Sequence, residues 1–280
     1  MSALWAAFLG FVQGVAEFLP ISSSGHLSVL QNLLGLDAGE GHLLFDVLLH
    51  LATFFAVCLA YRRDLGKMLG DSLDYFRGTG AYAGRKKGGR LPAATRLVLL
   101  LAVGTLPLFL VLPFHSQIET LYYNSFFIGI MFLLTGGMLY AADHMPQGTK
   151  KARTTRVTDA LIVGFCQAVA TIPGLSRSGA TVSAGMAVGM ERSFAVKFSF
   201  LLSLPAVLGA NILSLVDAVQ TGGIELAMVP KYLLGMVVAF VTGYAAIALL
   251  RLIARKGYFG KFCYYCWGVG VVTILLSIIF

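Results

Sequence analysis

Charged residues are scarce in this sequence, because Asp, Glu, Lys and Arg together make up only 12% of its 280 residues. Soluble domains carry roughly 25% of these residues. With 58% hydrophobic residues as well, the chain has too little polar surface to cover a water-exposed fold. The composition therefore argues against an ordinary soluble protein and favours an integral membrane protein.

Acidic residues and cysteines are also few. The 13 Asp and Glu are outnumbered by 21 Lys and Arg, which gives a net charge of +8. This excess does not indicate nucleic-acid binding, because the cations gather in short segments between apolar runs, as in cytoplasmic loops. Cys263 and Cys266 form a C-x-x-C without the second pair of ligands that a structural zinc site needs. We interpret them as buried apolar residues.

Long apolar runs are what the sequence does contain. A helix needs about 20 residues to cross a bilayer. Six apolar runs are long enough, and we predict full transmembrane helices near 42–61, 95–113, 124–142, 194–214, 230–250 and 262–280. Two further apolar stretches, 3–34 and 157–190, are broken by Pro, Gly and Ser. The sequence therefore predicts an all-α polytopic membrane protein.

Lys and Arg predict the orientation of these spans. They concentrate in the linkers 62–96, 143–156 and 251–261, which we place in the cytoplasm. All six spans then alternate consistently, and each broken stretch begins and ends on the same side of the membrane. We therefore expect two re-entrant helix hairpins, whose irregular backbone must be buried in protein or line a wet cavity.

An internal repeat relates the two broken stretches. Residues 10–25 (GFVQGVAEFLPISSSG) and 164–179 (GFCQAVATIPGLSRSG) match at eight of sixteen positions at an offset of 154. Three predicted spans separate the copies, so the second copy is inverted. We expect a single membrane domain over 1–280, with repeat one at about 1–142 and repeat two at about 157–280. Broken helices of inverted repeats meet near the membrane midplane and form binding sites.

The first broken stretch carries a polar constellation. Gln13 and Glu17 lie four residues apart and share a helix face, and Pro20 should end that helix near Leu19. A serine of the following run can cap a second helix starting near His26, whose N-terminus can bind an anion. Glu17 is either a structural carboxylate or, as is usual inside membranes, a functional one. Beside it, His26 suits proton transfer, although a packing role is the alternative.

The second broken stretch places Arg177 deep in the membrane. An unpaired guanidinium is costly there, and its planar fork suits phosphate. A salt bridge to Glu17 is the structural alternative, and both can hold if the pair forms in the empty site. The helix after Gly179 should also point its N-terminus at the site. Asp46 and His50, four residues apart, are either supporting residues of this site or a local pair on one helix face.

Together these motifs resemble the undecaprenyl-pyrophosphate phosphatase (bacitracin-resistance) family. The resemblance rests on Q-G-V-A-E-F-L-P-I-S-S-S-G-H at 13–26 and P-G-L-S-R-S-G-A-T at 173–181, with F-D-V-L-L-H at 45–50 in support. It implies a multi-pass enzyme of the bacterial plasma membrane, with an interdigitated inverted-repeat fold and a site open to the periplasm. Such an enzyme hydrolyses undecaprenyl pyrophosphate to the monophosphate, which recycles the carrier lipid for cell-wall synthesis and confers resistance to bacitracin.

The resemblance also implies roles for individual residues. Its catalytic set falls on Glu17, Ser23, His26 and Arg177. Its substrate-binding set falls on Gln13, Ser22, Ser24, Ser176, Ser178 and Thr181. It further implies a divalent cation, Mg²⁺ or Ca²⁺, held near Glu17. The first motif begins with Gln13 rather than Glu, which argues against two carboxylates holding that metal. The expected partners are the prenyl pyrophosphate and membrane lipid, with a homodimer left open and no nucleic acid.

Three other functions compete with this hypothesis. A prenyl-phosphate transporter or flippase could use the same pocket, but transport does not need nucleophiles beside the arginine. The acid-phosphatase-like lipid phosphatases share the S-G-H and S-R fragments, but their K-x6-R-P element is missing here. A receptor or scaffold would leave Glu17 and Arg177 unexplained.

Overall fold

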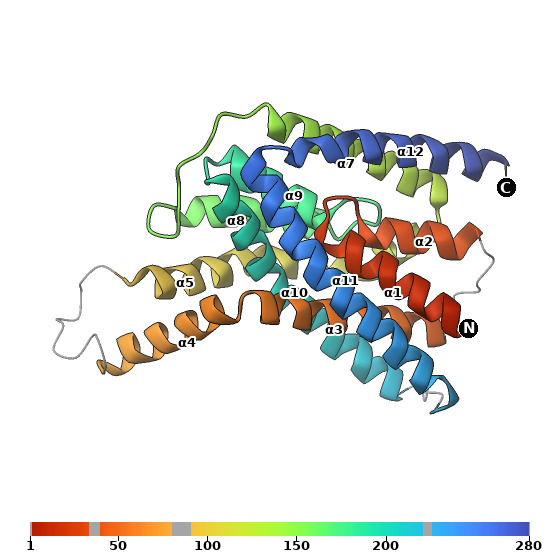
Figure 1. Cartoon of the computed structure of the whole chain (residues 1–280), viewed down its shortest axis with the longest axis horizontal. Helices are drawn as coiled ribbons and strands as arrows, with labels where there is room; N and C mark the ends of the chain where they lie inside the picture. The colour runs from red at the N-terminus through yellow and green to blue at the C-terminus, as the bar shows by residue number, and fades with distance from the viewer. Residues whose placement is uncertain (1, 34–39, 80–90, 221–225, 280) are drawn as a thin grey trace.

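The computed structural model describes residues 2–33, 40–79, 91–220 and 226–279, and within these ranges the regular elements are all helices. Figure 1 shows them packed into one bundle, in which they run at different angles to one another. The α-helices are α1 (Ala3–Phe18), α2 (Ser23–Leu33), α3 (Glu40–Ala60), α4 (Arg62–Arg77), α5 (Ala93–Thr105), α6 (His115–Leu121), α7 (Ser125–Asp143), α8 (Val157–Val169), α9 (Arg177–Ala187), α10 (Arg192–Gln220), α11 (Val229–Lys256) and α12 (Phe262–Ile279).

Long apolar helices make the chain a multi-pass membrane protein. Five helical segments are long and apolar enough to cross a bilayer, and a sixth is counted if the bent pair α3 and α4 forms one span. The five are Ala93–Leu121, Ser125–Asp143, Arg192–Ile212, Val229–Lys256 and Phe259–Ile279. The prediction of an all-α polytopic protein is confirmed at this level.

One predicted span extends further than expected. The run predicted at 95–113 continues to Leu121 as α5, two short 3₁₀ segments and α6. Pro107 and Pro113 lie in the 3₁₀ segments, because proline has no N–H for an α-helical bond and its ring crowds the preceding turn. The prolines thus tighten the helix here without ending it.

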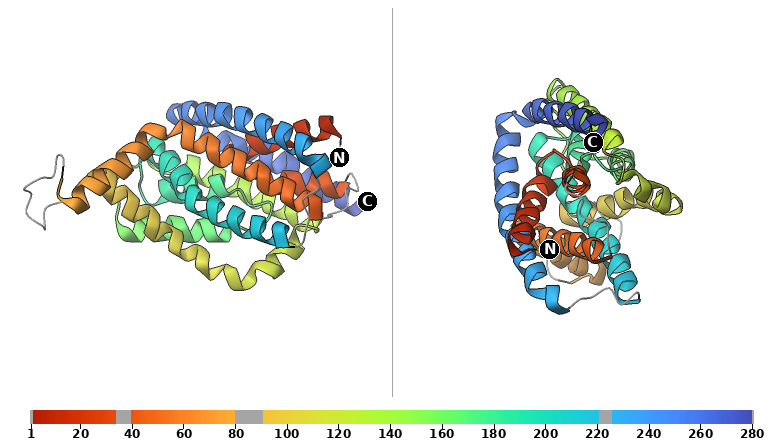
Figure 2. Two further views of the ribbon diagram at one scale, coloured as in Figure 1. Left: turned by 90° about the horizontal axis from the view of Figure 1, so that it is seen from below. Right: turned by 90° about the vertical axis from the view of Figure 1, so that its right-hand side faces the viewer.

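The first half of the predicted basic linker over 62–96 is helical. Residues Arg62–Arg77 form α4, which is bent by 73° from α3. Figure 2 shows α4 leaving the bundle at the end opposite both termini. A left-handed Gly78 ends the helix, and residues 80–90 lie outside the described ranges.

Two helix–turn–helix units carry the two polar motifs. Ser2 caps α1 by accepting a hydrogen bond from the N–H of Trp5 at 3.2 Å, and α1 ends at Phe18, as Pro20 predicts. The next helix, α2, begins at Ser23, three residues before the predicted start near His26. Likewise α9 begins at Arg177 instead of after Gly179. Both corrections move the motif residues onto the first turns of helices.

Each unit packs against a helix from the other half of the chain. α1 packs on α11, and α8 packs on α5. Glycines allow both crossings, because a Cβ on Gly10 would meet the carbonyl oxygen of Gly235 at 2.4 Å, and one on Gly164 would meet that of Gly104 at 1.9 Å. Small residues at such crossings let helix backbones approach closely, which stabilises helix pairs in membranes.

The α5–α8 crossing gives the first prediction. Gly164→Ala should lower the thermal stability of the detergent-solubilised protein, because the added methyl group must push α8 away from α5. Overpacking of this kind costs roughly 1–3 kcal/mol. Gly137→Ala is the matched control, since a Cβ there meets no atom within 4 Å. A Gly164→Ala melting temperature equal to that of Gly137→Ala would contradict the tight crossing.

Candidate active site

Glu17 lies in the last turn of α1 and collects the polar groups around it. Its side chain is 7% exposed. One carboxylate oxygen, Oε1, forms an ion pair with Nη2 of Arg177. The other, Oε2, accepts hydrogen bonds from Ser23 Oγ at 2.7 Å and Gln13 Nε2 at 3.1 Å, and lies 3.6 Å from Nε2 of His50. A buried carboxylate is stable only with such partners.

Arg177 is the first residue of α9 and joins the two halves of the chain. Glu17 is 160 positions away in sequence, and the ion pair between the two side chains is the salt bridge that the sequence offered as one alternative. The Arg177 side chain remains 26% exposed, which leaves part of the guanidinium available to another anion. Its fork of N–H donors can bind a phosphate in the same way as it binds the carboxylate.

The turn between α1 and α2 has a strained backbone. Ser22 has a φ of 67°, a value that no other non-glycine residue in the described ranges shares. Its hydroxyl accepts a hydrogen bond from the N–H of Gly25 at 3.3 Å and lies 3.4 Å from the hydroxyl of Ser24. Left-handed backbone at a non-glycine residue is uncommon and tends to occur at functional sites. Here it turns the chain so that Ser23 faces Glu17.

The turns of the two helix–turn–helix units contact each other. A Cβ on Gly25 would lie 2.8 Å from the Cα of Gly174, and Ser178 Oγ donates to the main-chain oxygen of Leu19 at 3.2 Å. The N-termini of α2 and α9 therefore meet next to Glu17. First-turn N–H groups have no partner within their own helix, and with the helix dipole they favour an anion.

The ring nitrogens of His26 contact groups other than Glu17. Its Nδ1 lies 2.7 Å from the main-chain oxygen of Ser22, and its Nε2 lies 2.8 Å from the hydroxyl oxygen of Tyr265. No atom pair between the His26 ring and the Glu17 carboxylate lies within ion-pair distance in the described structure. Sequence analysis missed Tyr265, because 239 residues separate it from His26 and no local pattern marks it.

The predicted substrate-binding hydroxyls of α9 make bonds within the protein. Ser176 Oγ caps the helix by accepting from the N–H of Gly179 at 3.1 Å, and it lies 3.3 Å from Ser178 Oγ. The Thr181 hydroxyl donates to the oxygen of Arg177 at 2.8 Å and contacts Ser199. These bonds fix the start of α9 against its neighbours. Their predicted contacts with substrate stay predictions.

His50 reaches the site from α3. Its Nδ1 is 2.8 Å from the main-chain oxygen of Asp46, which orients Nε2 towards Glu17. The Asp46 side chain instead accepts from Nε2 of Gln31 at 3.1 and 3.3 Å. The two alternatives from sequence therefore both apply in part: a local helix bond orients His50, and the oriented ring contacts the site. Gln31 was missed because a lone glutamine carries no recognisable pattern.

The donors around Glu17 suit a hard cation more than zinc. Buried Oε1 of Gln13 has no hydrogen-bond partner in the described structure, and it adds an oxygen donor beside the carboxylate. Among the described residues, no group of three His, Cys, Asp or Glu forms a metal site. Mg²⁺ binds proteins through one or two carboxylates and completes its shell with water and substrate phosphates. Glu17 and Gln13 fit that donor set.

One small cavity lies beside Glu17. A cavity of about 10 Å³ is bordered by Glu17, Thr53 and Ser203, among others. This volume is about that of one water-sized probe, so it is too small for a phosphate group.

The sequence of the chain was compared with those of known proteins. The family described as bacitracin resistance protein BacA matches residues 6–272. Proteins named undecaprenyl-diphosphatase are 38% identical in Desulforapulum autotrophicum and 37% in Carboxydothermus hydrogenoformans, over 97% and 99% of this chain and 97% and 98% of theirs. One from Methanobrevibacter smithii is 37% identical over 99% of both chains. The chain belongs to the bacitracin resistance protein BacA family.

Proposed function

We propose that this protein hydrolyses undecaprenyl pyrophosphate to undecaprenyl phosphate and inorganic phosphate. The observation that carries the proposal is the chain of contacts from Arg177 through Glu17 to Ser23, which puts an anion ligand, a base and a nucleophile within one hydrogen-bonded group. The relatives named undecaprenyl-diphosphatase support the same reaction. Phosphoryl transfer depends mainly on positioning and charge stabilisation, and this group supplies both.

Substrate binding begins with an exchange of partners at Arg177. The diphosphate carries more negative charge than the Glu17 carboxylate and offers more oxygens, so it competes for the guanidinium. The first-turn N–H groups of α2 and α9 add positive ends of helix dipoles on the same side. The hydroxyls of Ser22, Ser24, Ser176 and Ser178 line the turns around this position and complete the proposed binding set.

Ser23 is the nucleophile that the geometry favours. Its hydroxyl already donates to Glu17 at 2.7 Å, so the proton can pass to the carboxylate as the serine oxygen attacks the terminal phosphorus. The bond from that phosphorus to the bridging oxygen breaks, and prenyl monophosphate leaves. Water then attacks the phosphoserine, and inorganic phosphate departs as the serine recovers its proton. Splitting one step into two in this way is ordinary covalent catalysis.

His26 is less suited to attack phosphorus. Both of its ring nitrogens are engaged, one by the oxygen of Ser22 and one by Tyr265. Its contact with Ser22 stabilises the start of α2, and its contact with Tyr265 can transfer a proton between the imidazole and the phenol hydroxyl. His50, whose Nε2 faces Glu17, is a further polar neighbour of the carboxylate.

A divalent cation is part of the proposal. Glu17 and Gln13 Oε1 would hold it together with substrate oxygens, and it would neutralise charge that develops on the phosphates. Mg²⁺ and Ca²⁺ both accept such oxygen donors. The residues around it still bind the diphosphate, exclude bulk water and move the serine proton.

The packing of the helices supports the proposed architecture of six spans, two re-entrant hairpins and an interdigitated inverted repeat. The sequence offset of 154 relates the starts of α1 and α8, at residues 3 and 157, and of α2 and α9, at residues 23 and 177. The contacts of α1 with α11 and of α8 with α5 are equivalent under this relation if α5 and α11 are counterparts. Each hairpin is thus held by the other half of the chain.

The surroundings of the site fit a lipid substrate. We place the protein in the bacterial inner membrane with its basic segments in the cytoplasm, with the site opening to the periplasm and the prenyl chain lying between helices. There the reaction would recycle the carrier lipid for cell-wall synthesis. A homodimer remains part of the proposal. The alternative function, transport of a prenyl phosphate, would not need the hydrogen bond between Ser23 and Glu17. The relatives named undecaprenyl-diphosphatase do not support a transporter.

Phosphate release in detergent tests the function directly. Wild-type protein with undecaprenyl pyrophosphate should release inorganic phosphate, because detergent abolishes sidedness but leaves hydrolysis intact. A chelator should reduce the rate by about 100-fold, since a bound cation supplies several kcal/mol of charge stabilisation. Added Mg²⁺ or Ca²⁺ should restore it. Absence of phosphate release from folded protein with cation present would overturn the proposal, and full activity in chelator would remove the cation from it.

A further inference from the structure

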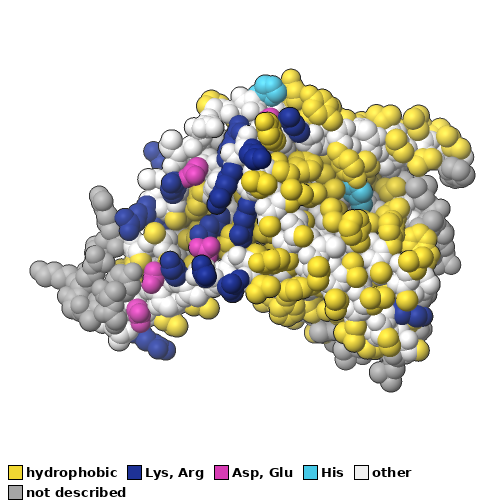
Figure 3. Space-filling model, viewed as in Figure 1, with side chains coloured by type: hydrophobic (Ala, Val, Ile, Leu, Met, Phe, Trp, Pro, Cys, Tyr) yellow, Lys and Arg dark blue, Asp and Glu magenta, His cyan; other side chains and the backbone are white. Residues whose placement is uncertain are grey.

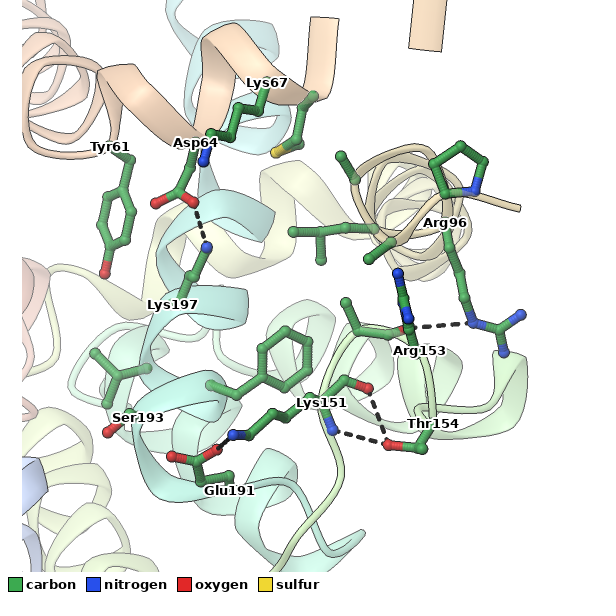
Figure 4. A pocket seen from close by; sticks show the side chains of 18 of the residues that line it. Tyr61, Asp64, Lys67, Arg96, Lys151, Arg153, Thr154, Glu191, Ser193 and Lys197 are labelled. Carbon is green, nitrogen blue, oxygen red and sulfur yellow. Dashed lines mark hydrogen bonds and ion pairs between the residues drawn. The ribbon is translucent and has the colours of Figure 1, made fainter. Parts of the chain in front are cut away.

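A much larger cavity lies away from Glu17. It has a volume of about 1450 Å³ and is bordered by α4, α5, α10, α11 and the loop around residues 151–154. Figure 4 shows its side chains, none of which belongs to the proposed catalytic set. Ligand pockets are typically ~300–1,000 Å³, so this space can hold a sizeable polar group.

The cavity is strongly basic. Seven Lys and Arg line it against three Asp and Glu, for a formal net charge of +4. Two of the carboxylates are neutralised, by the pairs Lys197–Asp64 and Lys151–Glu191. Because the remaining cations outnumber the remaining carboxylate, the cavity is suited to an anion.

The unpaired cations fall into two groups. Arg96 and Arg251 bind main-chain carbonyl oxygens, which leaves their charge unneutralised. Lys67, Arg153 and Arg255 make no ion pair with any carboxylate in the described ranges, and their side chains are exposed. A ligand with phosphate oxygens would find three uncommitted cations around one space.

The α4 helix, which forms one wall of the cavity, carries apolar side chains on another of its faces. Lys67 and Met68 line the cavity, whereas Leu69, Leu73 and Phe76 are exposed large apolar side chains of the same helix. Their spacing of four and three residues puts them on one helix face. A polar helix with such a face, lying at 73° to the preceding helix, is typical of helices in the membrane interface.

A band of cations separates the hydrophobic part of the molecular surface from its polar end. Figure 3 shows Lys and Arg crossing the molecule between an extended hydrophobic surface and a more polar end that includes α4. Basic residues at that boundary attract anionic lipid. The cavity is basic and lies at this boundary, and the adjoining hydrophobic surface favours a lipid anion over a soluble one.

We propose that this cavity binds the phosphodiester headgroup of an anionic glycerophospholipid from the surrounding leaflet. Lys67, Arg153 and Arg255 bind the phosphate, and the acyl chains run from the cavity to the hydrophobic surface on the other side of the cation band. The site is independent of the proposed hydrolysis. Its role is to fix α4 and the adjoining loop at the membrane surface.

Paired charge-removal variants test this site. The cavity variant is Lys67→Ala with Arg255→Ala, and its matched control is Arg63→Ala with Lys256→Ala, which removes the same charge from the same two helices outside the cavity. Detergent-solubilised proteins are titrated with phosphatidylglycerol, phosphatidylcholine or soluble glycerol phosphate, and melting temperature is measured. A ligand that binds only the folded state raises it.

Phosphatidylglycerol should stabilise wild type and the control, and phosphatidylcholine and glycerol phosphate should not. The cavity variant should bind phosphatidylglycerol about 10- to 30-fold more weakly, since each cation near a lipid surface contributes ~1 kcal/mol. Arg153→Ala is a second cavity variant in case the first does not fold. Equal loss in the control, equal stabilisation by phosphatidylcholine, or full stabilisation by glycerol phosphate would each overturn the proposal.

Discussion

Arg177→Ala should lower kcat/KM for phosphate release by at least about 1,000-fold, the lower range for an arginine that stabilises a phosphoryl-transfer transition state. Arg177 is the cation that the structure brings to Glu17, and the diphosphate needs the same guanidinium. Arg177→Lys should recover only part of the activity, because lysine keeps the charge but lacks the planar fork. Steady-state phosphate release in detergent gives both values.

The Arg177 result needs a test for folding. Removing one partner of a buried ion pair costs roughly 3–5 kcal/mol, so a double variant, Arg177→Ala with Glu17→Gln, should regain stability without regaining activity. Arg192→Ala is the control, since Arg192 forms a 3.9 Å pair with Asp143 outside the site. Wild-type turnover by a folded Arg177→Ala protein would refute the assigned role.

Glu17→Gln should lower kcat by about 100- to 10,000-fold, the range for loss of a general base. The substitution keeps the shape of the side chain but removes the acceptor of the Ser23 proton and the carboxylate partner of Arg177. It should also weaken the response to added cation, because an amide binds Mg²⁺ less well than a carboxylate. Rates at several Mg²⁺ concentrations separate the two effects.

Glu191→Gln is the matched control for Glu17→Gln. Glu191 pairs with Lys151 at 3.0 Å, and its side chain is 39% exposed. Exposed ion pairs contribute little to stability, so this variant should keep wild-type turnover. Activity of Glu17→Gln comparable with that of Glu191→Gln would mean that another group accepts the serine proton.

Hydrophobicity predicted most of the fold. The long apolar runs and the early stop at Pro20 correspond to helices and a helix end in the structure. The helix α4 was missed because its Arg, Lys and Asp residues resemble a loop, although Leu69, Leu73 and Phe76 repeat with helical spacing. A search for apolar spans gives low weight to a helix that has only one apolar face.

The site was predictable only where its residues form local motifs. Glu17, Ser23 and Arg177 stand in two short motifs, and the internal repeat brings those motifs together. Tyr265 contacts His26, which is 239 residues away in sequence. Gln31 contacts Asp46, but it is a single side chain that belongs to no motif. One ring nitrogen of His26 contacts Tyr265, and this contact could not be predicted from sequence spacing.

The cross-packing of the two halves has a consequence for biosynthesis. Translation delivers Glu17 to the membrane 160 residues before its arginine partner, and α1 has to wait longer still for α11. Until then the nascent amino-terminal half holds an acidic group and glycine-rich helix surfaces without their final neighbours. The protein can therefore become competent only after nearly the whole chain has left the ribosome.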